Sequence, residues 1–243
     1  MPLLERAQAK TVEASEMTIM EHLQALRRVL IITFGSFALF TLIAAFFSRQ
    51  LADLLITRAG LPKAYYTTPV GGVVFDLEIA LFVGALAAVP IVVQQIWWFV
   101  GPGLHLHERR LLLPIVVATV VFFYMGAGVA GYTLPLFLRI LGSLAPSNLL
   151  YLPVGGDLLT FILIMVIAFG VVFEMPVILY TLGRLGIISS KWLYKNRLYW
   201  IIGLAVLANL LTPGVDPVTP FILFIPLYIF WEGTTLLLKL GGH

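Results

Sequence analysis

The chain has 243 residues, of which 60% are hydrophobic and only 11% are charged, and its mean hydropathy is +1.02. A water-soluble domain of this length needs more charge to cover its surface, so the composition indicates a membrane protein. The absence of cysteine excludes disulfides, thiolate metal sites and cysteine nucleophiles. No basic stripe with interleaved aromatic residues indicates a nucleic-acid partner.

Six apolar segments follow one another along the chain, at residues 29–47, 79–101, 111–138, 158–182, 198–211 and 219–238. Each is predicted to cross the membrane as a helix, because lipid tolerates only helices or closed barrels and these runs lack period-two alternation. Residues 48–76 and 142–157 are predicted to be long, polar-leaning loops. We therefore expect one all-α membrane domain over residues 18–238, a curved bundle of six transmembrane helices. Residues 1–17 and 239–243 are the predicted tails.

The segment before the first span is predicted to form an amphipathic helix at the cytoplasmic face. Ile19, Leu23 and Leu26 fall on one face at helical spacing, and Thr18 with Glu21 three residues later is a capping-box pattern. Glu21 is therefore as well explained by capping as by binding. Its basic and polar side chains could instead form an anchor on anionic lipid: His22, Gln24, Arg27 and Arg28.

The distribution of lysine and arginine predicts the orientation. With both termini cytoplasmic, the outer side holds only Arg49, Arg58, Lys63 and Arg139. The inner side then holds Arg6, Lys10, Arg27, Arg28, Arg109, Arg110, Arg184, Lys191, Lys195, Arg197 and Lys239. The opposite orientation would reverse this bias, so both termini are expected in the cytoplasm.

The fifth apolar segment, residues 198–211, is short for a membrane span. Its residues would rise only about 21 Å as a helix, against a hydrocarbon core of about 30 Å. We expect neighbouring helices to shield it or the bilayer to thin around it. A misplaced boundary is the alternative.

Glu174 is the one carboxylate well inside an apolar segment, where an ionised side chain is costly. It requires a partner, a water-filled cavity or a bound proton. Pro176 cannot donate a backbone hydrogen bond, which leaves a free carbonyl in the preceding turn. We interpret Glu174 as a functional polar site. The structural alternative is a protonated side chain bonded to a neighbouring helix.

Three glycines in the third segment, Gly126, Gly128 and Gly131, are predicted to allow close helix packing rather than to form a ligand site. Two loop carboxylates, Glu108 and Asp216, have ordinary explanations when taken alone, a solvated loop charge and a turn residue.

Motifs for catalysis are absent from the sequence. It contains no phosphate-binding loop, no His-Glu-x-x-His and no Gly-x-Ser-x-Gly. We therefore expect no enzymatic activity, no cofactor and no metal.

Five short motifs in order resemble the TatC family, and together they cover residues 18–232. Each motif is weak alone, but their order, spacing and six-segment profile make the combination specific. They are His22-Leu23-Gln24-Ala25-Leu26-Arg27; Pro90, Gln95, Trp97, Phe99 and Pro102-Gly103-Leu104; Glu108-Arg109-Arg110; Phe169-Gly170, Phe173-Glu174 and Pro176; and Thr212-Pro213, Asp216, Pro226, Tyr228 and Glu232.

The resemblance implies a receptor for signal peptides that carry consecutive arginines on folded export cargo. It implies that Glu108 binds an arginine and that Phe99 and Pro102 form the wall beside it. A carboxylate accepts the planar guanidinium fork in a bidentate manner, which distinguishes arginine from lysine without catalysis.

The first motif departs from the family pattern, because Ala25 stands where the family has a glutamate. Glu21 lies one helical turn away on the same face and could replace that carboxylate. Leu23 and Arg27 are the other implied signal-peptide contacts on this segment. The closing motif also has one extra residue between Pro213 and Asp216.

The resemblance also implies a cellular setting. This is the bacterial inner membrane, with TatA- and TatB-type small subunits as partners and the proton-motive force as the energy source. The signal peptide's apolar stretch would enter a groove toward Glu174, and Asp216 and Thr219 would contact partners at the outer loop. The sequence leaves open whether the chain forms a homo-oligomer.

Two other functions remain open from the sequence. A small-solute or proton-coupled secondary transporter could use Glu174 and Asp216, although the two halves show no hydropathy repeat. A Tat-like scaffold without receptor activity is compatible with Ala25.

Overall fold

The computed structural model describes residues 19–101, 112–146, 148, 152–212 and 219–242. Within these ranges the regular structure is helical, apart from one isolated parallel bridge between Tyr65 and Val154. The prediction of an all-α protein is therefore confirmed for the described part of the chain.

Five stretches of the described residues are long and apolar enough to cross a membrane, so the chain is a multi-pass membrane protein. They lie in α2 (Ile19–Ala45), α4 (Gly71–Val100), α5 (Leu112–Leu144), the consecutive helices α6 (Gly155–Phe173) and α7 (Met175–Arg184), and α10 (Thr219–Leu240). The apolar helix α9 (Arg197–Leu211) has only 15 residues, or about 22 Å. The predicted shortness of this segment is thus confirmed, and its boundaries were not misplaced.

The amphipathic segment is not a separate surface helix. It forms the first turns of α2, which begins ten residues before the predicted span and continues for 27 residues. Good helix formers such as Leu23, Gln24 and Arg27 fill the junction, so nothing ends the helix there. At about 40 Å, α2 is longer than the hydrocarbon core and must extend beyond it.

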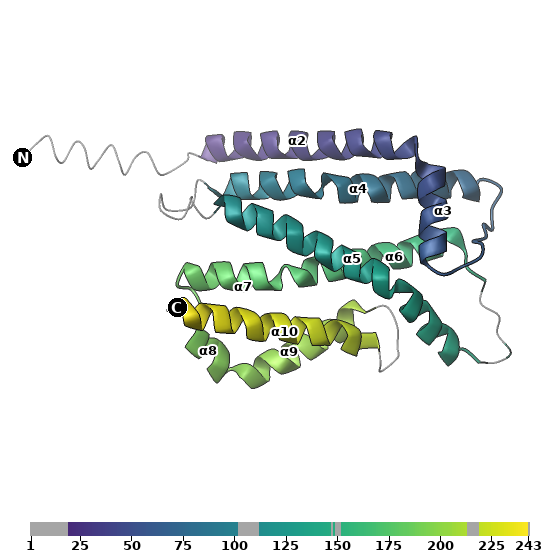
Figure 1. Cartoon of the computed structure of the whole chain (residues 1–243). Helices are drawn as coiled ribbons and strands as arrows, with labels where there is room; N and C mark the ends of the chain where they lie inside the picture. Colours follow the sequence, from purple (N-terminus) through teal and green to yellow (C-terminus); the bar gives the residue numbers. More distant parts are fainter. Residues whose placement is uncertain (1–18, 102–111, 147, 149–151, 213–218, 243) are drawn as a thin grey trace, which may run out of the picture.

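The loop prediction for residues 48–76 was wrong at both ends, because residues 71–76 already belong to α4 and the first residues form another helix. Residues Ser48–Arg58 form the helix α3, which crosses α4 steeply near its start (Figure 1). Ala52 is buried, and Leu51 and Leu55 pack against the same core. The charges interspersed among these residues lower the local hydropathy and conceal this helix from a search for spans.

The helices run up and down between two ends (Figure 1). One end, here called the terminal end, holds the start of α2, the ends of α4, α7 and α10, and the short helix α8 (Ser190–Lys195). The opposite end, here called the α3 end, holds α3 and the Tyr65–Val154 bridge. Both ends of the described chain therefore lie on the same side of the bundle.

The core surrounds α6, in which eleven residues are buried. Close packing against α5 depends on Gly126, where an added Cβ would lie 2.5 Å from the carbonyl oxygen of Phe169. The packing role predicted for Gly126 is confirmed. The same prediction was wrong for Gly128 and Gly131. Nothing lies within 4 Å of a Cβ added at either position, because both residues face other sides of α5.

Candidate functional site

A ring contact at the terminal end joins the first two family-like motifs. The His22 ring of α2 and the Phe99 ring of α4 are 4.4 Å apart between centroids, at an interplanar angle of 36°. The contact forms because α2 packs chiefly against α4 along its length. Two segments separated by 77 positions in the sequence therefore meet at one place.

The predicted contacts on α2 lie in the same first turns of the helix as His22 and are accessible. Glu21 and Arg27 are exposed, and Leu23 is 52% exposed. Glu21 and Ala25 are four residues apart on a continuous helix, so they share one face. Glu21 thus lies one helical turn from position 25.

Several predicted site residues lie outside the described residues. These are Pro102, Glu108 and Asp216. Thr219 is the first residue of α10. Phe99 lies near the end of α4, two residues before the described range 19–101 ends.

Glu174 lies at the junction of α6 and α7, inside the span Gly155–Arg184. The side chain is half-buried, and its Oε1 has no hydrogen-bond partner among the described residues. Thr119 and Phe123 of α5 lie beside the carboxyl group. The helix break next to Pro176 therefore places an incompletely paired carboxyl group within the membrane span.

A second polar cluster at the terminal end was not predicted. The Arg197 guanidinium donates to the Tyr228 hydroxyl and lies 3.7 Å from Oε1 of Glu232. It also lies over the rings of Tyr228 and Trp231, at 5.8 and 6.0 Å from their centroids. The Tyr194 hydroxyl donates to the same Glu232 oxygen at 3.3 Å.

This cluster joins the start of α9 to α10. Tyr228 and Glu232 were recognised only as parts of the closing motif. Arg197 stands 35 positions before Glu232, and no local pattern relates the two. The one available signal was an arginine at the start of an unusually short apolar helix.

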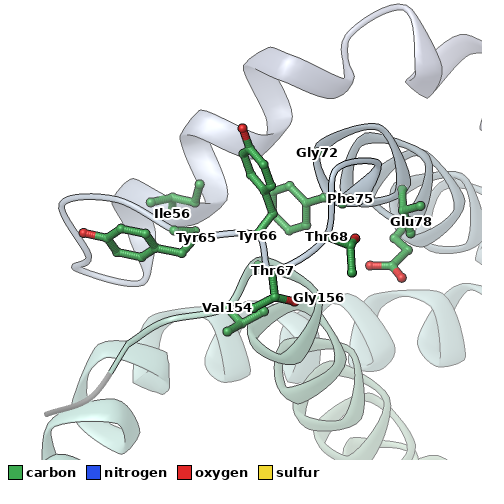
Figure 2. A pocket seen from close by; sticks show the side chains of 14 residues that line it. Ile56, Tyr65, Tyr66, Thr67, Thr68, Gly72, Phe75, Glu78, Val154 and Gly156 are labelled. Atoms are coloured by element: carbon green, nitrogen blue, oxygen red, sulfur yellow. The ribbon is translucent and has the colours of Figure 1, made fainter.

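The α3 end contains a cavity of about 280 Å³ beneath the loop that follows α3. Figure 2 shows the side chains that line it, which include Tyr66, Thr67 and Thr68 of this loop and Glu78 of α4. Glu78 Oε2 would lie 3.6 Å from a Cβ added at Gly156, so the carboxylate is near the N-terminus of α6. We interpret the cavity and Glu78 as structural features that hold the loop after α3 in place, rather than as a ligand site.

Backbone pairing also holds the loop. The Tyr65 N–H donates to the Pro153 carbonyl, and the Gly155 N–H donates to the Tyr65 carbonyl, each at 2.8 Å. No group of three or more His, Cys, Asp or Glu residues within the described ranges could hold a metal ion.

Comparison with known proteins identifies the family. The sequence model described as Sec-independent protein translocase protein (TatC) matches residues 21–226. The chain belongs to the TatC family. This membership makes it a component of Sec-independent protein translocation, and it gives no support to the alternative of a solute transporter.

Relatives and solved structures cover nearly the whole chain. A TatC protein of Carboxydothermus hydrogenoformans is 33% identical over 94% of this chain and 95% of its own. A TatC protein of Aquifex aeolicus is 33% identical over 93% and 96%, respectively. A crystal structure of a twin-arginine translocase receptor TatC superposes with a TM-score of 0.72 at 31% identity, covering 92% of this chain and all of that one.

Proposed function

We propose that this TatC family member is the receptor that binds twin-arginine signal peptides of folded cargo and nucleates the translocase. The proposal is supported by the 31% identity with a solved structure described as a twin-arginine translocase receptor. The observation that carries it is the His22–Phe99 contact, because it joins two segments of the implied binding surface.

The proposed topology has six crossings, with both termini in the cytoplasm of a bacterial cell whose inner membrane holds the protein. Under this proposal α9 is the fifth of the six crossings, although it is too short to span an undisturbed bilayer unaided. The positive-inside rule supports the orientation, and the shared position of both described ends supports an even number of crossings (Figure 1).

Arginine recognition would take place at the terminal end. Glu108 would accept one guanidinium group with two parallel hydrogen bonds, and Phe99 and Pro102 would form the adjoining wall. Glu21 would act as the second carboxylate in place of residue 25, with Leu23 and Arg27 beside it. The exposure of Glu21 and Leu23 supports this assignment.

The remaining steps would involve the membrane interior and the partner subunits. The apolar stretch of the signal peptide would approach Glu174, whose unpaired Oε1 could accept a hydrogen bond from a polar group. TatA- and TatB-type subunits would assemble around the bundle, with Asp216 and Thr219 among their contacts. The protein would act by binding rather than by catalysis, with the proton-motive force as the energy source.

Binding of a labelled twin-arginine peptide to the full chain in nanodiscs tests the proposal. A twin-lysine peptide should bind at least about tenfold more weakly, because an ammonium group cannot form the bidentate contact. Glu108→Gln and Glu21→Gln should each reduce the preference for arginine. Asp53→Asn is the matched control, because Asp53 is an exposed carboxylate on α3 at the other end.

Equal, weak binding of both peptides by the unmodified chain would contradict the receptor proposal. It would favour a Tat-like scaffold that has lost receptor activity. Ala25→Glu would then show whether the missing carboxylate is responsible.

A further inference from the structure

A shallow groove runs along one face of α2 near the terminal end. Its lining residues recur at helical spacing, so they form a single stripe: Gln24, Arg27, Arg28, Ile31 and Ile32. The open volume is about 460 Å³. Along the stripe, hydrogen-bond donors come first and isoleucines follow one turn later, about 6 Å further along the axis.

The position of Arg28 relative to the membrane follows from the helix lengths. Arg28 precedes Ala45, the last residue of α2, by 17 positions, which is about 26 Å of helix. Trp98 follows Glu78 by 20 positions on α4, or about 30 Å. Each length is close to the thickness of the hydrocarbon core. Arg28 and Trp98 therefore mark the same membrane boundary on two neighbouring helices.

A direct contact supports this placement. The Arg28 guanidinium carbon lies 4.9 Å from the centre of the Trp98 ring. Tryptophan is enriched where the apolar core meets the headgroups, and half of the Trp98 side chain is exposed. Because tryptophan is typical of the headgroup level, its contact with Arg28 favours the same level for the guanidinium group.

The charge around the groove is positive. Arg27 and Arg28 are both exposed, and the residue one turn before Arg28 is Ala25, which offers no neutralising carboxylate. The acidic residue of this helix end is Glu21, about 10 Å of helix away from Arg28. Ile31, 60% exposed, continues the stripe on the apolar side.

We propose that this groove binds an anionic phospholipid, with the phosphate between Arg27 and Arg28 and an acyl chain along Ile31 and Ile32. Arginine offers a planar fork of donors that matches phosphate geometry, and the Gln24 amide adds a further donor. The isoleucines favour a lipid over free phosphate, because they provide apolar surface where the chain of a lipid would lie. The site shares Arg27 with the proposed signal-peptide surface, but lipid retention is measured without a signal peptide.

Native mass spectrometry of the full chain, released from micelles doped with phosphatidylglycerol or phosphatidylcholine, tests the site. The unmodified chain should retain phosphatidylglycerol selectively. Arg27→Gln with Arg28→Gln should weaken its retention about tenfold. Ala25→Glu should also weaken it, by placing a carboxylate one turn from Arg28. Arg49→Gln with Arg58→Gln, which removes the same charge from α3, should leave retention unchanged.

Three results would overturn the proposal. These are equal retention of both lipids by the unmodified chain, undiminished retention by the Arg27→Gln, Arg28→Gln variant, or displacement of the lipid by excess inorganic phosphate. The last result would show that the groove recognises the phosphate group alone. The readout is lipid retention, so failure of the receptor proposal would leave this test intact.

Discussion

The helices α2 and α6 are both strongly apolar, but they have opposite surroundings. In the span that contains α6, 56% of the most apolar window is buried within the protein, against 11% for α2. Helix α6 is enclosed by α5, α4 and α10, whereas α2 packs chiefly against α4. An apolar sequence therefore serves two purposes, protein packing in α6 and an outward-facing surface suited to lipid in α2.

This difference predicts where a small change in side-chain volume will be tolerated. Around α6, backbone atoms of neighbouring helices meet, and backbone cannot move without shifting a whole helix. Along the lipid-facing side of α2, an added methyl group displaces only lipid. Substitutions of glycine test this distinction, because the chain offers close and open glycines in the same helices.

The largest effect is expected for Gly126→Val in α5. The new Cβ would lie 2.5 Å from the carbonyl oxygen and 2.8 Å from the carbonyl carbon of Phe169. Both atoms belong to the backbone of α6, so the helices must separate, at a cost of about 3 kcal/mol or more. Thermal unfolding in detergent, followed by circular dichroism, would measure the loss.

Gly128→Val is the matched control for that substitution. It adds the same side chain to the same helix, where nothing lies within 4 Å of an added Cβ. Its unfolding midpoint should remain close to that of the unmodified chain. Equal losses in both variants would mean that the α5–α6 contact does not limit stability.

Much of this architecture was predictable from residue patterns, and the failures have identifiable causes. Apolar runs located the spans because each must cover about 30 Å of hydrocarbon. The helix α3 was missed because Arg49, Asp53 and Arg58 lower its hydropathy, although its buried face follows helical spacing.

The candidate site was predictable only in part. The motifs named Phe99 and the α2 residues, but the stacking of His22 on Phe99 depends on how two helices pack. The contact between Arg197 and Glu232 likewise depends on how two helices, α9 and α10, pack together. Sequence patterns assign residues to helix faces, and tertiary packing decides which faces meet.

An intermediate effect is expected for Gly84→Val, which affects the contact between α2 and α4. The new Cβ would lie 2.7 Å from both the Cα and the backbone nitrogen of Thr41. Because α2 has few other contacts, it should shift away from α4 while the α6 core stays folded, with a loss of about 2 kcal/mol. The absence of native cysteine allows a spin-label pair at positions 39 and 85 to report the separation.

Gly35→Val in α2 is the control, because nothing lies within 4 Å of an added Cβ there. The distance distribution between the labels should broaden only in Gly84→Val. Unfolding of the whole protein by Gly84→Val would show that α2 is part of the cooperative core rather than a peripheral helix.

The smallest effect is expected for Tyr124→Phe, which removes one hydroxyl group. Pro90 lacks an N–H, so the Leu86 carbonyl one turn earlier in α4 loses its usual helical donor. The Tyr124 hydroxyl on α5 donates to this carbonyl at 2.8 Å. Tyr124→Phe should therefore destabilise the protein by about 1 kcal/mol. Tyr132→Phe, whose side chain is 88% exposed, should have no effect.

A double-mutant cycle with Pro90→Ala would identify the cause of that loss. Alanine restores an N–H at position 90, which can donate to Leu86 within α4. Tyr124→Phe should then be nearly neutral in the Pro90→Ala background, and the coupling between the two sites should account for most of the loss. An unchanged loss in that background would assign the role of Tyr124 to ring packing instead. A positive result would show that α5 supplies the donor that a proline removes from α4, so that the packing of these two apolar helices depends on a specific polar contact.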